Sequence, residues 1–215
     1  MSYQMVYNLL NATGETLYMV LISTLFAIIL GLPLGTLLYS SKYVKPNQKL
    51  HKMLSALINI FRSIPFIILL VAIIPFTRLL VGTSIGMNAA IVPLSIGATP
   101  FFARLVDNVY QSLSKGLIET GYAMGASSRQ IIFHILLPEA KPGLIHAVTV
   151  TAITLVNYSA MAGTVGAGGL GTLAINYGYQ RFDAGVMIAT VIVLIVMVQM
   201  IQMLGDGLAK RFLHH

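Results

Sequence analysis

The chain has 215 residues, of which 57% are hydrophobic and only 9% are charged. Soluble domains usually carry about 25% charged residues, so this composition excludes an ordinary soluble domain and indicates a membrane protein. The net charge is +7, but the basic residues are scattered through short segments between apolar runs. That distribution is typical of topology signals and not of a nucleic-acid-binding surface. The absence of cysteine excludes disulfides, thiolate nucleophiles and cysteine metal sites.

Five apolar segments are long enough to cross a bilayer, which takes about 20 residues. They lie at 16–41, 54–74, 85–103, 144–165 and 184–204. The first three are expected to be kinked because of Pro33, Pro65, Pro75, Pro93 and Pro100. Residues 1–14 carry no Lys or Arg, and the first apolar run is too long for a signal-peptide core, so no cleavable signal is expected. We predict an all-α membrane protein of about five transmembrane helices in a single domain, 1–215.

The distribution of Lys and Arg between the connections predicts the orientation of the spans. One side of the membrane is predicted to carry ten basic residues: Lys42, Lys45, Lys49, Lys52, Arg104, Lys115, Arg129, Lys141, Lys210 and Arg211. The other side carries only Arg78 and Arg181. Because Lys and Arg are enriched in cytoplasmic loops, we expect the ten-residue side and the C-terminus in the cytoplasm, and the N-terminus outside.

The connection at about 104–143 is long and has the features of a structured segment. A short helix is expected over 115–124, with Glu119 early in it, where the helix dipole favours an anion. Gly125 suits the left-handed position that ends such a helix.

A second short helix is expected to begin at Ser127, with Gln130 three residues later as its capping-box partner. This helix is expected to stop before Pro138. The resulting helix–glycine–helix segment, residues 115–138, is called the elbow below. Physical reasoning alone leaves two interpretations open, a docking element at the membrane surface and a simple connector of two spans.

The elbow contains a motif with regular spacing. Glu119 precedes Gly125 by six residues, and after nine intervening residues comes Ile135-Leu-Leu-Pro138. This motif resembles the EAA loop of ABC-importer permeases, in which two alanines follow the Glu and a later I-x-L-P closes the pattern. The chain departs from the pattern at Thr120 and Gly121, and a glycine weakens a helix by about 1 kcal/mol relative to alanine.

The resemblance extends over essentially the whole chain. The segments similar to permeases of methionine importers are 59–66, 74–78, 81–86 and 158–171. The motif in the elbow is specific for the permease class, whereas the choice of methionine depends on overall likeness. Another small amino acid or an osmolyte is the alternative substrate.

Several properties follow only from this resemblance. It implies a type I ABC importer permease of the bacterial inner membrane that works as a homodimer. The implied partners are two cytosolic ABC ATPase subunits, an extracytoplasmic substrate-binding protein and membrane lipid. No nucleic acid is expected as a partner. ATP and Mg would be bound by the ATPase, and no cofactor is expected on this chain, which has no G-x-x-x-x-G-K-[ST] motif. The ATPase-coupling residues that it implies are Glu119, Gly121, Ala123, Met124, Gly125, Ala126 and Pro138.

The run Gly166-Ala-Gly-Gly-Leu-Gly171 matches the G-x-G-x-x-G fingerprint of dinucleotide-binding proteins. That fingerprint needs a strand before it and a helix after it, whereas this run closes a membrane span. Nucleotide binding is therefore rejected. The glycines are expected to allow close helix packing or a re-entrant turn.

Arg62 is the one charge well inside a predicted span, about 12 Å from the span's start at 1.5 Å per residue. Placing an arginine at the membrane centre costs about 2.5–3.5 kcal/mol, and such residues are candidates for a substrate pathway. The alternative is that Arg62 snorkels to the cytoplasmic interface or ties helices together. We favour the alternative, because a short shift of the span boundary removes the cost.

The fourth span carries a stripe of polar and thioether side chains on one helical face. Its members are Thr151, Thr154, Tyr158 and Met161. The stripe either lines a substrate pathway or bonds neighbouring helices, at about 0.6 kcal/mol per bond. Because none of these residues is charged, a zwitterionic or apolar substrate fits a pathway better than a strongly ionic one.

Three classes of function remain to be compared. The first is a transporter permease, and the second is a non-transporting membrane scaffold whose elbow binds another cytosolic partner. The third is an intramembrane enzyme, which would need paired carboxylates or histidines within the spans. Since only His146 lies near a span, and His134 and His146 lack further ligands, neither catalytic residues nor a metal site are expected.

Overall fold

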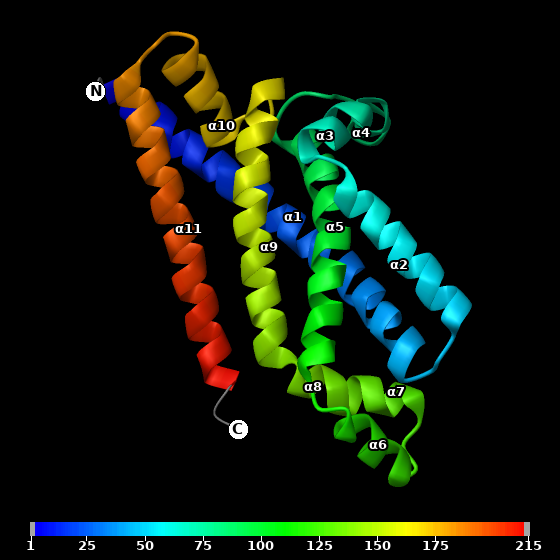
Figure 1. Cartoon of the computed structure of the whole chain (residues 1–215). Coiled ribbons are helices and arrows are strands. Elements are labelled where there is room, and N and C mark those ends of the chain that lie inside the picture. Colours follow the sequence, from blue (N-terminus) through cyan, green and yellow to red (C-terminus); the bar gives the residue numbers. More distant parts are fainter. Residues whose placement is uncertain (1–2, 213–215) are drawn as a thin grey trace.

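The structure, a computed structural model, describes residues 3–212, which form helices and turns without any strand. Four helices in this part of the chain are long and apolar enough to cross a membrane. They are α1 (Tyr3–Tyr43), α5 (Met87–Ser112), α9 (Lys141–Ala162) and α11 (Ala184–Phe212). Figure 1 shows α5, α9 and α11 running between the same two ends of the molecule, with α1 crossing behind them at a slant.

The kink predicted for the second span at Pro65 is present as a sharp bend. The span consists of α2 (Gln48–Ser63) and α3 (Phe66–Ala72), which meet at an angle of 95°. The bend follows from Pro65, which has no N–H to donate and forces the preceding Ile64 out of the helical region, to φ −78° and ψ 122°. Counted together, the bent pair gives a fifth crossing, as the sequence predicted.

The short helices gather at the two ends of the molecule (Figure 1). Those of the elbow end are α6 (Gly116–Ala123), α7 (Ser128–Gln130), the π-helix η1 (Ile131–Leu136) and α8 (Leu137–Glu139). Those of the opposite end, beside α3, are α4 (Ile74–Val81), the 3₁₀-helix η2 (Gly163–Val165), α10 (Gly169–Leu173) and the π-helix η3 (Ala174–Tyr179). Helix α1 begins at the opposite end and finishes at the elbow end.

Glycines bring the backbones of α1 and α5 close together. A Cβ at Gly31 would lie 2.9 Å from both the Phe102 ring and the Thr99 carbonyl oxygen. One helical turn later, a Cβ at Gly35 would overlap the carbonyl of Ala103. Small residues spaced in this way let two membrane helices approach closely, which replaces the hydrophobic driving force that lipid does not supply.

The glycine-rich run 166–171 forms a tight turn against α9 and α1. A Cβ at Gly171 would overlap the backbone of Ala160, which confirms the expected close packing. The turn is capped by α1, because Glu15 accepts a hydrogen bond from the Gly169 N–H at 2.6 Å and Thr16 accepts one from the Leu170 N–H at 2.9 Å.

Candidate coupling surface and translocation pathway

The two helices of the elbow pack against each other through Gly121. This glycine and Ile118 are buried, on the inner face of α6. A Cβ at Gly121 would lie 3.0 Å from side-chain atoms of both Ile131 and Ile135. The glycine that departs from the EAA pattern therefore permits a close approach of the two helices, and this packing offsets its weaker helix propensity.

The turn of the elbow depends on Gly125 and Ser127. Gly125 has φ +80°, and no atom lies within 4 Å of the place where a Cβ would stand, so its left-handed conformation, and not crowding, requires glycine. The predicted capping box is confirmed, because the Ser127 N–H donates to Oε1 of Gln130 at 2.8 Å and the Gln130 N–H donates to Oγ of Ser127 at 3.4 Å.

The expectation that the second helix stops before Pro138 is wrong. Helix α7 continues through η1 into α8, and the Leu137 N–H donates to the carbonyl of Ile132, five residues earlier. This π-type bonding shifts the hydrogen-bond register, so that Pro138 lies in the first turn of α8, where a missing N–H is tolerated. Bonds from Ala140 to Leu136 and from Leu144 to Ala140, at 2.9 and 2.8 Å, then join the elbow directly to α9.

Tyr122 ties the elbow to the end of α1. Its hydroxyl donates to the carbonyl of Val44 and lies 3.1 Å from Oγ of Ser128. Sequence reasoning missed this residue, because no local pattern marks a bond between positions so far apart in the chain. The tether connects a movement of the elbow to α1 as well as to α9.

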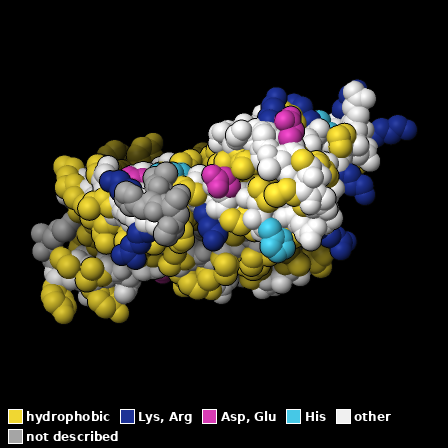
Figure 2. Space-filling view, turned by 90° about the horizontal axis from the view of Figure 1, so that it is seen from below, with side chains coloured by type: hydrophobic (Ala, Val, Ile, Leu, Met, Phe, Trp, Pro, Cys, Tyr) yellow, Lys and Arg dark blue, Asp and Glu magenta, His cyan; other side chains and the backbone are white. Residues whose placement is uncertain are grey.

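The outer face of α6 is exposed. Glu119 and Ala123 are exposed, and Met124 is exposed to 72%. Figure 2, which views the molecule from the elbow end, shows Lys, Arg and His side chains spread around this surface. Of the predicted coupling residues, the structure therefore places Glu119, Ala123 and Met124 together outside, whereas Gly121 points inward.

The predicted loop 104–143 is wrong at its start, because α5 continues to Ser112. Arg104 lies within α5 and bonds both its own helix and α2. Its guanidinium donates to Oδ2 of Asp107 at 3.1 Å and to Oδ1 of Asn59 at 2.7 Å. Asp107 is only 2% exposed, and the ion pair balances its charge.

Arg62 and Tyr158 line the same cavity, of about 250 Å³, at the bend between α2 and α3. The ring of Tyr158 stacks on Phe66 with centroids 4.2 Å apart and planes 4° from parallel. Gly97 of α5 also lines this cavity and lies beside Phe66, where a Cβ would stand 3.3 Å from the ring. Arg62 is exposed and makes no hydrogen bond or ion pair with any residue from 3 to 212, so within that range it does not tie helices together.

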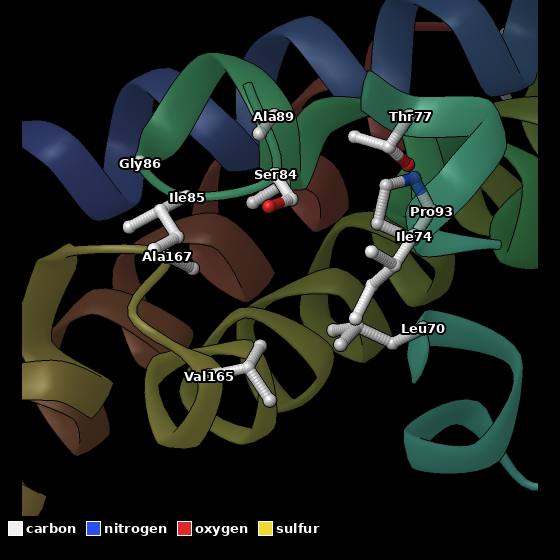
Figure 3. Close-up of a pocket in the computed structure, with 11 residues that line it drawn as sticks. Leu70, Ile74, Thr77, Ser84, Ile85, Gly86, Ala89, Pro93, Val165 and Ala167 are labelled. Carbon is white, nitrogen blue, oxygen red and sulfur yellow. The ribbon is translucent and has the colours of Figure 1, made fainter. Parts of the chain in front are cut away.

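A second cavity, of about 240 Å³, lies at the opposite end (Figure 3). Its lining is mostly apolar and comes from α3, α4, the start of α5 and the glycine-rich turn, with Leu70, Ile74 and Pro93 among the labelled residues. Helix α3 separates the two cavities, since Leu69 lines the first and Leu70 the second.

The four residues of the predicted stripe on α9 lie in different surroundings in the structure. Thr151 is fully buried, and its hydroxyl donates to the carbonyl of Ala147 at 2.8 Å. The Thr154 hydroxyl donates likewise to its own helix, at Val150, so neither threonine bonds a neighbouring helix. Neither Thr154 nor Met161, which is 40% exposed, lines the cavity that holds Tyr158.

Two exposed amides lie on the outer face of α9 and α11. Asn157 and Gln199 line a shallow depression whose other walls are apolar, among them Leu194 and Val198. An amide facing lipid lacks hydrogen-bond partners, which costs free energy. Sequence reasoning assigned no role to these amides, although polar residues within apolar spans are a recognised signal of a functional face.

Comparison with known families decides the class of protein. Residues 27–214 match the family described as binding-protein-dependent transport system inner membrane component. The chain belongs to this family. The permease is accordingly a multi-pass transport component of the inner membrane and not an enzyme, and the predicted fold class is confirmed.

Individual relatives match the permease along most of its length. The probable D-methionine transport system permease protein MetI of Vibrio cholerae is 52% identical over 208 residues, covering 96% of this chain and 92% of that protein. The D-methionine transport system permease protein MetI of Escherichia coli K12 is 54% identical over 165 residues, 76% of each chain.

Solved structures have the same architecture. A chain from inward-facing conformations of the MetNI methionine ABC transporter superposes with a TM-score of 0.97, at 51% identity and 99% coverage of both chains. An amino acid ABC transporter crystallised with histidines gives a TM-score of 0.79 over 96% of this chain and 94% of that one. At 17% identity, the second likeness shows the fold alone.

Proposed function

We propose that the permease is the membrane-spanning subunit of an ATP-driven methionine importer, which moves its substrate inward by alternating access. The observation that carries this proposal is the likeness to a chain of the MetNI methionine ABC transporter, at 51% identity over 99% of this chain. The Vibrio and Escherichia relatives, whose names also specify D-methionine transport, support the same substrate.

The proposed assembly contains two copies of the permease, two cytosolic ABC ATPase subunits and an extracytoplasmic binding protein. ATP and Mg would be held by the ATPase subunits. The whole chain would act as one transmembrane domain, with the ten-residue basic side and the C-terminus in the cytoplasm and the N-terminus outside. Support comes from the fold, in which α1 begins at one end and α11 finishes at the other, as an odd number of crossings requires (Figure 1).

The elbow supplies a physical route for coupling. An ATPase cleft would receive the exposed face of α6, with Glu119 and Met124 at its centre. Displacement of α6 would pass through the Gly121 contact into η1 and then along α8 into α9, because these helices follow one another without a loop. Since α9 carries Tyr158, closure of the ATPase would reshape the Arg62 cavity.

The Arg62 cavity is the proposed part of the substrate pathway. A guanidinium binds a carboxylate with charge-assisted hydrogen bonds, and a thioether packs favourably against aromatic rings. The cavity offers Arg62 beside the Phe66–Tyr158 stack, which matches both ends of methionine. Thr154 and Met161 are proposed to contact the substrate farther along the pathway, on the exposed face of α9.

The amide-bearing face of α9 and α11 is proposed as the contact with the second copy. Around a two-fold axis the same face meets itself, so Asn157 and Gln199 of one copy would find hydrogen-bond partners on the other. The face is continuous with the exposed residue Met161, so the pathway would lie between the two copies.

The test is uptake by the purified permease–ATPase complex reconstituted in proteoliposomes with the binding protein. Labelled L-methionine and D-methionine are compared with other amino acids and with an osmolyte such as glycine betaine. We expect substrate-stimulated ATPase activity and uptake for methionine alone. Stimulation of the ATPase activity by another solute, without methionine uptake, would show that this other solute is the substrate. Failure of an ATPase to copurify would indicate a non-transporting scaffold.

The cavity is tested by a pair of variants at one position. Tyr158→Phe keeps the stack on Phe66, whereas Tyr158→Ala removes it, and such aromatic pairs are worth about 0.5–1.5 kcal/mol. We expect near-normal uptake from Tyr158→Phe and a raised KM from Tyr158→Ala, with unchanged assembly. Equal kinetics for both variants would remove Tyr158 from the pathway.

A further inference from the structure

An apolar groove of about 330 Å³ opens at the elbow end, away from the Arg62 cavity. Three long helices form most of its walls. These are α1 with Ile28 and Leu32, α9 with Leu144 and Val148, and α11 with Leu208 and Phe212. All of these side chains belong to segments that cross the membrane or end at its surface, so the groove faces the acyl-chain region and the head groups next to it.

The back of the groove is apolar and is closed by the packing of α9 against α11. Thr149 lines it, but its hydroxyl already donates to the carbonyl of Ile145 at 2.9 Å. Gly205 of α11 packs directly on Thr149, where a Cβ would overlap the threonine side chain. A polar solute would find no free hydrogen-bond donor at the back of the groove, whereas an alkyl chain requires none.

A single cation stands among the groove-lining residues. Lys141, at the start of α9, is exposed, and its Nζ lies 6.0 Å from the centre of the Phe212 ring. Within residues 3–212 it takes part in no ion pair. Lys141 and Phe212 also line an adjoining cavity of about 440 Å³, whose other lining residues include Ser112 and Glu139. The apolar groove therefore borders a more polar cavity at Lys141.

The charges around this opening are mostly positive. Lys210 and Arg211 form the last turn of α11, next to Phe212. The nearby acidic groups are Glu139, which lines the adjoining cavity, and Asp206. Asp206 accepts a hydrogen bond from Gln202 at 2.8 Å and lies 3.7 Å from His146, so it is partly satisfied by its own neighbours.

We propose that this groove is a binding site for an anionic phospholipid, with an acyl chain between α1, α9 and α11 and the phosphate beside Lys141. The pairing of an apolar slot with a cation at its membrane-surface end matches the two parts of one lipid molecule. Basic pockets between membrane helices at the cytoplasmic surface hold anionic head groups in this way. The bound lipid would fill the groove next to the junction of the elbow with α9 and stabilise the position of that junction.

The experiment uses the whole permease–ATPase complex in nanodiscs of phosphatidylcholine. A small fraction of phosphatidylglycerol with a photoreactive diazirine in one acyl chain is the probe, and phosphatidylcholine with the same diazirine chain is its control. Cross-linked peptides are then mapped by mass spectrometry. We expect labelling by the phosphatidylglycerol probe to concentrate on the peptides around Leu144 and Leu208, and to be displaced by unlabelled phosphatidylglycerol but not by inorganic phosphate.

Two variants separate the contribution of the head-group contact from that of the apolar groove. Lys141→Gln removes the cation, and since a basic residue at a membrane surface contributes about fivefold in affinity for anionic lipid, labelling should fall by about that factor. Val148→Trp fills the apolar groove and should abolish labelling without a change of charge. Lys45→Gln, a basic residue at the same end but outside the groove, is the matched control and should leave labelling unchanged.

Four results would overturn the proposal. Equal labelling by both probes would mean that the groove takes bulk lipid without recognising charge. Labelling spread evenly over the apolar helices, or equal in Lys141→Gln and in Lys45→Gln, would remove the site. Labelling that arises only after deletion of residues 213–215 would show that the chain's own C-terminus occupies the groove. Methionine uptake plays no part in these readouts, so the lipid site and the proposed transport function are tested separately.

Discussion

Replacement of Gly125 by valine tests whether the elbow couples or merely connects. Gly125 has φ +80° and no atom within 4 Å of its missing Cβ. The substitution therefore causes no steric overlap with the body, and its whole cost is conformational. A residue with a Cβ pays about 1–2 kcal/mol in the left-handed region, and a β-branched residue more.

The chain can avoid that cost by moving Gly125 out of the left-handed region, which would change the angle between α6 and α7. The capping box at Ser127 and the continuation of α7 through η1 into α8 would hold α7 in place. The displacement would therefore fall on α6, on its exposed face and on the Tyr122 tether. The spans would remain folded, because Gly125 is exposed and outside them. We expect normal expression and membrane insertion, with loss of methionine uptake.

The assay is uptake of labelled methionine in proteoliposomes, measured beside copurification of the ATPase. Gly125→Asn is the matched control, since asparagine tolerates the left-handed conformation better than other residues, and it should retain most uptake. Wild-type uptake by Gly125→Val at normal expression would mean that the elbow is only a connector and would refute the coupling argument.

Three further predictions address topology, the tether and packing. Single cysteines at Lys45 and Ser128, introduced into a chain without native cysteine, should be shielded from an impermeant thiol reagent in intact cells; ready labelling from outside would reverse the proposed orientation. Tyr122→Phe removes one hydrogen bond to the end of α1, worth about 0.5–1.5 kcal/mol, and should raise basal ATPase activity relative to uptake, whereas an unchanged ratio would show that the tether does not couple. Gly171→Ala places a Cβ against the backbone of Ala160, and overpacking of this kind costs about 1–3 kcal/mol. It should lower the unfolding temperature of the purified permease. Gly116→Ala, whose Cβ would meet only Oγ of Ser114 at 3.4 Å, serves as the control with an expected unchanged value.

Features that depend on bonds between near neighbours in the chain were predicted well. The apolar runs identified the membrane spans, because the bilayer requires long uninterrupted helices whatever their partners. The capping box at Ser127 and the left-handed Gly125 are equally local, since each is determined by residues within one helical turn. The same reasoning failed at Pro138, because a π-type shift of hydrogen bonding begins several residues earlier and has no strong sequence signature.

The departure at Gly121 illustrates the limit of motif comparison. From the sequence it is a flaw in a helix, worth about 1 kcal/mol. In the structure it is the contact that brings Ile131 and Ile135 against α6. A sequence pattern records only that residue 121 is a glycine. Its distance to the second helix decides whether the missing side chain merely weakens α6 or allows the two helices to pack closely.

The sequence by itself determined the membrane class, the number of crossings, the charge asymmetry and the position of the elbow, because these follow from transfer free energies and from local backbone preferences. Only the tertiary structure decided that Arg62 and Tyr158 share one cavity while Thr154 and Met161 lie outside it. The tertiary structure also decided that Tyr122 reaches the end of α1 and that Lys141 stands at the end of an apolar groove. Each of these features depends on the approach of segments that are distant in the chain. That approach is set by the 95° bend at Pro65 and by glycine contacts between helices. The periodicity of a sequence does not specify the geometry of such contacts.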